Sequence, residues 1–220
     1  MKNILITQRS EYILSRNEYM DCLDQQFSVI FSDSFNLIPI SNTTYEPQYF
    51  AESLQCDGII LSGGNTINKS VSDADSRRFK IEQSLLDYAR SKHIPVVGIC
   101  YGMQRLNVYC GGSLQKLSNH VANTHNVFFD EVNINVNSFH ENCILNSDLS
   151  PSFQTLGRCS DGTIECILHQ TLPWLGIMWH PERQMPEQNI WVNLLKKIFT
   201  EHKNISRKNI KALIDKSLKN

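Results

Sequence analysis

The chain has 220 residues, a net charge of −1 and seven cysteines. This length suits one α/β domain with a full core, and the balanced charge gives no electrostatic support for binding nucleic acid or a membrane. No apolar run approaches the ~20 residues of a membrane span, and the first residues lack the apolar stretch of a signal peptide. The cysteines show no Cys-x-x-Cys spacing, so we expect neither disulfides nor a zinc site, but a reduced protein in the cytoplasm.

The first half of the chain alternates between strand-like and helical patterns. Short apolar runs predict strands at residues 3–7, 37–40, 57–61 and 95–99. Helical spacing predicts helices near residues 17–32, 46–54 and 74–91. Such alternation is typical of a parallel sheet that is covered by helices on both faces.

The second half is richer in strands, and the chain ends in a helical segment. Strands are expected near residues 127–136, 153–158, 163–168 and 173–179. From about residue 187 to residue 220, apolar residues recur at helical spacing among many lysines. We expect this segment to dock on the domain and to expose its lysines, rather than to bind a membrane or an anionic partner.

The most informative stretch is the strand-to-helix junction at residues 98–102, Gly-Ile-Cys-Tyr-Gly. An apolar run ends there and a helical pattern starts at once, which is the layout of a nucleophile elbow with Cys100 as the nucleophile. At the amino end of a helix, unpaired backbone N–H groups and the helix dipole stabilise a thiolate. The alternative is that Cys100 is simply a small apolar residue in a tight junction.

A second motif favours the catalytic interpretation of Cys100. Residues 174–179 predict a buried strand, which leads directly into His180, Pro181 and Glu182. An imidazole can take the proton of a thiol, and a carboxylate can hold the other ring nitrogen in one tautomer. Pro181 restricts the preceding residue, so we expect His180 to be extended.

On these residues the sequence resembles the class I glutamine amidotransferase-like family, specifically its γ-glutamyl hydrolase branch, which includes the γ-glutamyl-γ-aminobutyrate hydrolases (peptidase C26 type). Further motifs agree with that family in order and spacing at residues 57–64, 103–104, 106–107, 111–114, 137–140, 160–165 and 176–182. The resemblance implies a single α/β domain over residues 1–220. Its expected fold is a three-layer sandwich with a mostly parallel central sheet, of the flavodoxin-like type.

The resemblance also implies the roles of individual residues. Cys100, His180 and Glu182 would form a catalytic triad. The backbone N–H groups of Gly64 and Tyr101 would form the oxyanion hole, and a glycine pair allows such donors to approach a ligand closely.

A glutamyl substrate would be held by Gln104 and by the segment Asn137, Ser138, Phe139 and His140. Without the resemblance, the functional interpretation of Gln104 is favoured, and the alternative is a surface helix residue. The segment 137–140 could equally be a polar transition from strand to loop.

The resemblance leaves three functions open. The expected one is a stand-alone hydrolase that cleaves the γ-glutamyl amide of a small conjugate through a thioester, because residues 63–67, Gly-Gly-Asn-Thr-Ile, differ from the Gly-Pro-Gly-type loop of amidotransferase subunits. The second is a glutaminase subunit that delivers ammonia to a separate synthetase, its only expected protein partner beyond a possible homodimer. The third is a non-catalytic relative that binds a metabolite.

The leaving group is not determined by these motifs. One class is a small amine such as γ-aminobutyrate. The other is a nucleotide phosphoramidate, because some members of the branch resemble hydrolases of γ-glutamyl-CDP-amidate in capsule modification. Arg9 follows the first strand, at the edge where open α/β sheets bind ligands. Its guanidinium could bind a carboxylate or phosphate, or could pair with a nearby acid.

Other charged and metal-binding residue types carry weaker signals. Arg77 and Arg78 are expected on a solvated helix face. His120 and His125 lie in a loop and could line the cleft, but their spacing does not predict a metal site. No cofactor is expected.

Overall fold

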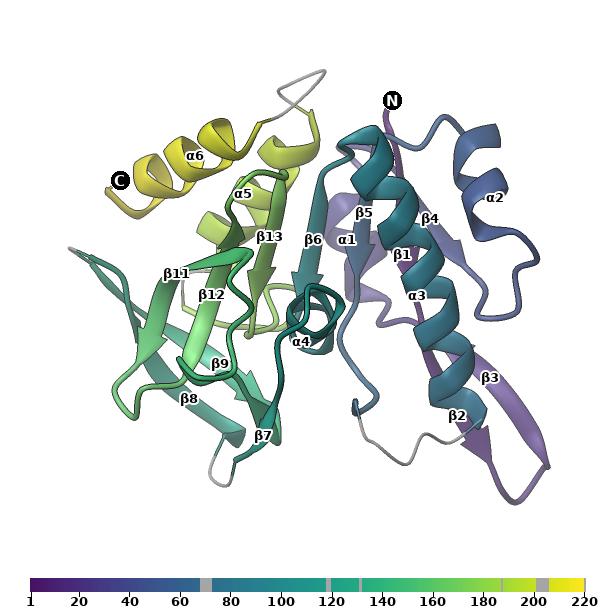
Figure 1. The fold of residues 1–220 in the computed structure, drawn as a ribbon, viewed down its shortest axis with the longest axis horizontal. Helices are drawn as coiled ribbons and strands as arrows, with labels where there is room; N and C mark the ends of the chain where they lie inside the picture. Colours follow the sequence, from purple (N-terminus) through teal and green to yellow (C-terminus); the bar gives the residue numbers. More distant parts are fainter. Residues whose placement is uncertain (68–72, 118–119, 131, 187, 201–205, 220) are drawn as a thin grey trace.

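The computed structural model describes residues 1–67, 73–117, 120–130, 132–186, 188–200 and 206–219. Its centre is a nine-stranded sheet with the order β4-β1-β5-β6-β13-β12-β11-β8-β9 (Figure 1). The first five of these are β4 (Asn36–Ile40), β1 (Asn3–Thr7), β5 (Gly58–Leu61), β6 (Val96–Ile99) and β13 (Trp174–Ile177). The other four are β12 (Ile164–His169), β11 (Phe153–Cys159), β8 (Val121–Phe128) and β9 (Asn133–Phe139).

The five strands from β4 to β13 are parallel to one another, and the other four continue the sheet in antiparallel fashion. Every residue of β5, β6 and β13 is buried, as is typical of parallel strands that are covered on both faces. The predicted α/β class with a parallel central sheet is confirmed.

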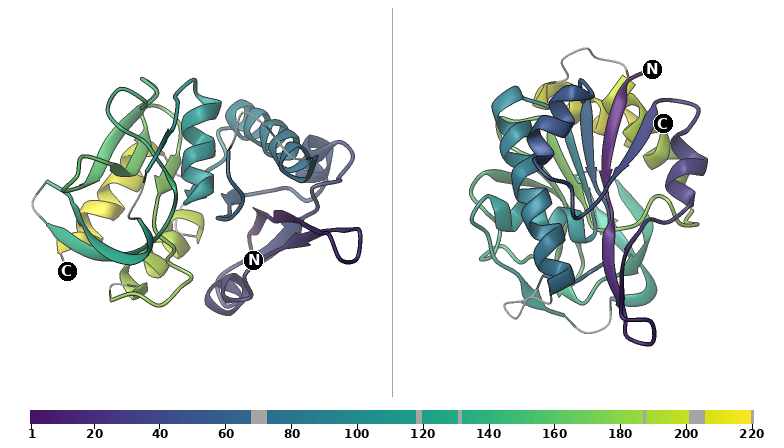
Figure 2. Two further views of the ribbon diagram at one scale, coloured as in Figure 1. Left: turned by 90° about the horizontal axis from the view of Figure 1, so that it is seen from below. Right: turned by 90° about the vertical axis from the view of Figure 1, so that its right-hand side faces the viewer.

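Helices cover both faces of the sheet and make three layers (Figure 2). One face packs against α1 (Gln26–Phe31), α5 (Gln188–Thr200) and α6 (Arg207–Lys219). The other face packs against α2 (Pro47–Ser53), α3 (Asp73–Lys92) and α4 (Tyr101–Tyr109). Alternate residues of β1 point to opposite faces, so Ile4 and Ile6 join the first core and Leu5 joins the second.

The predicted helix at residues 17–32 is wrong in its first half. Residues 9–22 form a hairpin of β2 (Arg9–Ile13) and β3 (Glu18–Cys22), and only α1 is helical. Tyr12 and Tyr19 lie opposite each other with ring centroids 4.7 Å apart, and Asn17 turns the chain with a φ of 52°. Cross-strand aromatic pairing of this kind outweighs the helical spacing of the apolar residues.

The single strand predicted at residues 127–136 is also wrong. Two antiparallel strands, β8 and β9, meet there, and the backbone N–H of Phe129 donates to the carbonyl of Val132 at 2.8 Å. Because the chain reverses at this point, one apolar pattern belongs to two strands. Residue 131, within this stretch, lies outside the described residues.

Two small elements and the C-terminal segment complete the fold. The short strands β7 (Gln115–Lys116) and β10 (Asn142–Cys143) pair with each other. Helices α5 and α6 occupy the segment predicted as helical from about residue 187; residues 187, 201–205 and 220 lie outside the described part. Among the described helices, none is both long enough and apolar enough to cross a bilayer.

Candidate active site

Cys100 lies at the sharp junction between β6 and α4. Its backbone is held at φ 51° and ψ −104°, a region that non-glycine residues rarely adopt, and its N–H donates to the carbonyl of Ile177 at 2.8 Å. A Cβ on Gly102 would lie 2.1 Å from the carbonyl oxygen of Leu61, so only glycine fits there. The elbow predicted from residues 98–102 is therefore present, with Cys100 at the amino end of α4.

His180 lies three residues beyond β13 and is paired with Glu182. Its Nδ1 lies 2.6 Å from Oε1 of Glu182, and both side chains are buried. Burial alone would lower the pKa of His180, but the adjacent Cys100 and Glu182 raise it to about 9. The imidazolium form of His180 is therefore stabilised by these two neighbours.

The side chains of Asn137 and Ser138 form hydrogen bonds with the backbone of the protein. The backbone N–H of His180 donates to Asn137 Oδ1 at 2.8 Å, and Asn137 Nδ2 donates to the carbonyl of His180 at 2.9 Å. Ser138 Oγ donates to the carbonyl of His120 at 2.7 Å. Both residues are buried, so these contacts fix His180 and the start of β8 in place.

A cavity of about 240 Å³ adjoins the cysteine and the histidine. Its lining includes Gly64, Tyr101, Gln104, Phe139 and His140 together with Cys100 and His180. The Phe139 ring lies edge-on to the His180 ring at 5.8 Å, and Gln104 Nε2 donates weakly to the carbonyl of Asn142 at 3.4 Å. Five of the predicted site residues therefore gather with the cysteine and histidine around one cavity.

Arg78 fixes the loop that contains Gly64, and the prediction that it is solvated is wrong. Its guanidinium is fully buried and donates to the carbonyls of Ser62 at 2.6 Å, Gly63 at 3.2 Å and Gly64 at 2.6 Å. In a trans peptide the N–H points opposite to the C=O, so holding the Gly63 carbonyl turns the Gly64 N–H away from Arg78. Arg78 is thus a positioning residue for the predicted oxyanion loop.

Arg78 is buried because a carboxylate is buried beside it. Glu82 Oε1 lies 2.8 Å from Arg78 Nε and accepts from Thr7 Oγ1 at 3.0 Å, while Arg105 Nε lies 3.6 Å from Glu82 Oε2. The Arg78 guanidinium also stacks over the Tyr101 ring at 4.0 Å. Spacing of residues 78 and 82 by four along a helix is the only sequence signal for this pairing.

Arg9 and Arg183 place two cations beside His180 and Glu182. Both line a smaller cavity that also contacts Gly64, His180 and Glu182, and Arg183 lines the larger cavity as well. Arg9 is half-exposed and paired with Glu11 at 2.7 Å. The Arg183 guanidinium lies over the Phe139 ring at 4.5 Å. Arg183 was not singled out from the sequence, although it directly follows the His-Pro-Glu motif.

Residues that could hold a metal lie in a cluster next to the larger cavity. The described residues include two sets with closely spaced ligand atoms, which share His120. One adds His140 and Glu165, and the other adds His125 and Cys159. His140 belongs both to this cluster and to the cavity lining.

Residues 21–198 match the family described as glutamine amidotransferase class-I. The chain is 30% identical over 201 residues to a gamma-glutamyl-CDP-amidate hydrolase from Campylobacter jejuni, covering 87% of this chain and 98% of that protein. It is 31% identical over 136 residues to a glutamine-hydrolyzing GMP synthase from Wolinella succinogenes, which is 57% of this chain and 24% of that enzyme.

Two solved structures have a similar fold. A putative GMP synthase subunit from Thermoplasma acidophilum superposes with a TM-score of 0.66 at 16% identity, covering 98% of this chain and 95% of that chain. A glutamine amidotransferase from Thermotoga maritima superposes with a TM-score of 0.61 at 14% identity, covering 99% of this chain and 96% of that chain.

Proposed function

The chain belongs to the class I glutamine amidotransferase family and is an amide-bond hydrolase of that type, and from this premise we propose that it releases glutamate from a γ-glutamyl nucleotide phosphoramidate. The observation that carries the proposal is the similarity to the Campylobacter jejuni hydrolase over nearly the whole of that protein. In its general form, the proposal is cleavage of a γ-glutamyl amide by Cys100; the phosphorylated leaving group is its more specific part.

In the first step, the Cys100 thiolate attacks the γ-carbonyl carbon of the substrate. The oxyanion that forms accepts hydrogen bonds from the backbone N–H groups of Gly64 and Tyr101. The C–N bond then breaks, and the leaving nitrogen takes a proton from the His180 imidazolium. The raised pKa of His180 supports this role, because it keeps that proton available at neutral pH.

In the second step, His180, now neutral, takes a proton from water. The resulting hydroxide attacks the thioester carbon, the C–S bond breaks, and glutamate leaves. Glu182 acts through His180, since its carboxylate at 2.6 Å from Nδ1 holds the ring and stabilises the imidazolium.

The two arginines support an anionic leaving group. Arg9 and Arg183 line the cavity next to His180, which delivers the proton to the leaving nitrogen. A planar guanidinium matches phosphate in geometry and charge. Gln104, Phe139 and His140 line the larger cavity, where Gln104 would hold a charged group of the glutamyl part and Phe139 and His140 would form the wall.

A second candidate function is a glutaminase subunit. The similarity to glutamine-hydrolyzing GMP synthase favours it, although this chain covers only 24% of that enzyme. Such a protein would need a separate synthetase to use the ammonia. A small amine such as γ-aminobutyrate remains the alternative leaving group for a stand-alone hydrolase.

The test is glutamate release by the purified chain, without a partner, from glutamine, γ-glutamyl-aminobutyrate, γ-glutamyl-putrescine and γ-glutamyl-CDP-amidate. We expect the highest kcat/KM with the phosphoramidate, and a loss of about 10⁴-fold or more in Cys100→Ala. Activity on glutamine alone would contradict the proposal. So would turnover in Cys100→Ala close to that of the wild type.

A further inference from the structure

Three buried side chains, two at strand ends and one within a strand, meet beside the larger cavity. His120 directly precedes β8, His140 directly follows β9, and Glu165 lies in β12. Their exposed fractions are 6%, 3% and 1%. Among the described residues, the hairpin of β8 and β9 pairs with β11 only through Val127 and Phe128, near its turn. His120 and His140, at its open end, lie close to Glu165.

The hydrogen-bond partners of the two histidines determine where their lone pairs point. His140 Nδ1 lies 2.9 Å from the carbonyl of Asn142 and must therefore carry a proton. His120 Nε2 lies 2.9 Å from Oδ2 of Asp161, which accepts and does not donate when ionised. The remaining nitrogens, His120 Nδ1 and His140 Nε2, are 3.2 Å apart. When both histidines are neutral, each of these two nitrogens carries a lone pair, and the two lone pairs repel each other. A bound cation or an added proton between them would remove this repulsion.

The spacing of the three ligand atoms fits a metal ion. His120 Nδ1 and His140 Nε2 are 3.2 Å apart, and Oε1 of Glu165 lies 3.6 Å from His140 Nε2 and 3.9 Å from His120 Nδ1. Ligand atoms at about 2.1 Å from a tetrahedral Zn²⁺ lie about 3.4 Å from one another. The observed triangle is therefore close to the face of a zinc coordination tetrahedron.

Unpaired polar atoms in the same place point to a missing ligand. Oε2 of Glu165 and both ring nitrogens of His125 are buried and lack a hydrogen-bond partner among the described residues. Oε2 of Glu165 lies 3.4 Å from His125 Nε2 without forming a hydrogen bond. The one hydrogen bond to this carboxylate among the described residues comes from Thr163 Oγ1 to Oε1 at 3.1 Å. A buried carboxylate with so few partners is costly, and a cation bound to it would offset that cost.

We propose that His120 Nδ1, His140 Nε2 and Glu165 bind a zinc ion. Two imidazoles and one carboxylate are a donor set that zinc uses, with a fourth position left open. A metal-bound histidine usually donates a hydrogen bond from its other ring nitrogen to a carboxylate or a backbone carbonyl. Here His120 Nε2 bonds to the Asp161 carboxylate, and His140 Nδ1 bonds to the Asn142 carbonyl. This proposal is independent of the substrate assigned above.

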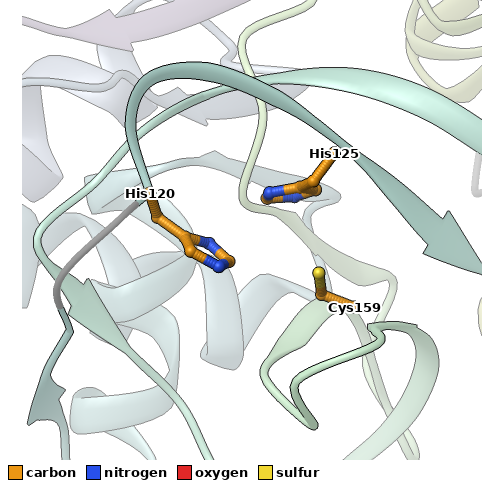
Figure 3. Close-up of side chains that lie close together, drawn as sticks. All are labelled: His120, His125 and Cys159. Carbon is orange, nitrogen blue, oxygen red and sulfur yellow. The ribbon is translucent and has the colours of Figure 1, made fainter.

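The zinc ion ties the hairpin to the rest of the sheet. It links the start of β8, the end of β9 and β12, and thereby fixes Phe139 and His140 on the wall of the catalytic cavity. The side chains of His125 and Cys159 converge on the neighbouring space together with His120 (Figure 3). They are the groups that an alternative ligand set would use.

The experiment measures zinc bound to the purified full chain. All proteins carry Cys100→Ser, so that the catalytic thiol cannot bind the metal. The proteins are stripped with a chelator, dialysed against Zn²⁺ and then against buffer, and analysed for metal content and for affinity by competition with a chromophoric chelator. Glu165→Gln and His140→Asn remove ligands, and the exposed His93→Asn, whose φ of 55° suits Asn, is the matched control.

We expect one zinc per chain in the Cys100→Ser protein and in the His93→Asn control, and a loss of at least tenfold in affinity in the two ligand variants. Zinc should also raise the melting temperature of the Cys100→Ser protein but not of Glu165→Gln, which keeps the size of the side chain. Absence of zinc from the Cys100→Ser protein would overturn the site. A thiolate charge-transfer band after cobalt substitution, lost in Cys159→Ser, would overturn the proposed ligand set.

Discussion

At the scale of single residues, the charge state of His180 decides whether the proposed chemistry can proceed. Burial favours the neutral ring, whereas Cys100 and Glu182 favour the imidazolium, and the balance raises the pKa to about 9. At neutral pH His180 is therefore an imidazolium. In this state the leaving nitrogen has a proton donor.

The pH dependence of activity follows from this raised pKa. A raised pKa means that the imidazolium persists below about pH 9 and is lost as the pH rises through that value. We therefore expect kcat/KM for glutamate release to fall above about pH 9. In Glu182→Gln this fall should move to lower pH, because one of the charges that stabilise the imidazolium is gone. An unchanged profile in Glu182→Gln would contradict the role of this carboxylate.

The leaving-group side of the site is tested by its two arginines. Replacing Arg183 or Arg9 by Gln should raise KM for γ-glutamyl-CDP-amidate by about tenfold, because each charged hydrogen bond is worth roughly 1.5–3 kcal/mol. KM for γ-glutamyl-putrescine, whose leaving group is cationic, should not rise. Arg16→Gln, an exposed arginine in the hairpin turn, is the control. Equal losses for both substrates would refute contact with phosphate.

At the scale of elements, the conformation of the loop after β5 depends on contacts with helix α3. Arg78 on α3 holds the carbonyls of Ser62, Gly63 and Gly64, and Asn65 ties the same loop to β2 through Ser10. The loop is thus held on both sides. The orientation of the Gly64 N–H follows from contacts that the loop sequence itself does not contain.

Lys at position 78 should disturb this loop, because an ammonium cannot make the forked set of bonds that the guanidinium makes. We expect Arg78→Lys to lower kcat more than it raises KM. Each buried carbonyl that loses its donor should lower the free energy of unfolding by about 1–3 kcal/mol. Arg77→Lys, on the same helix but half-buried against Tyr19, is the matched control. Unchanged kcat in a folded Arg78→Lys protein would remove Arg78 from the positioning role.

The elements that the sequence predicts well are those with local signals. The elbow at Cys100 and the motif at His180 are short, and each is placed by its own strand. Helical spacing fails for the hairpin at residues 9–22 because the Tyr12–Tyr19 contact is made across strands. It fails for the burial of Arg78 because the partners of that side chain come from β1, from the loop after β5 and from α3.

At the scale of the whole molecule, the alternating apolar runs predict the parallel centre of the sheet and its two helical layers, and the structure has both. The histidine cluster could not be predicted in this way. Its members lie at positions 120, 140 and 165, and they meet only through the tertiary arrangement of the β8–β9 hairpin and β12. The spacing of these residues along the sequence does not indicate that their side chains are in contact.

The most direct measurement is to map which cysteine reacts with a glutamine-like diazoketone. Cys22 and Cys110 are the more exposed thiols, whereas Cys100 is largely buried, so exposure alone would direct the label away from Cys100. We predict that peptide mapping will find the label on Cys100, and that γ-glutamyl-CDP-amidate will block it at a lower concentration than glutamine does. Labelling that follows exposure, or protection by glutamine alone, would contradict the account.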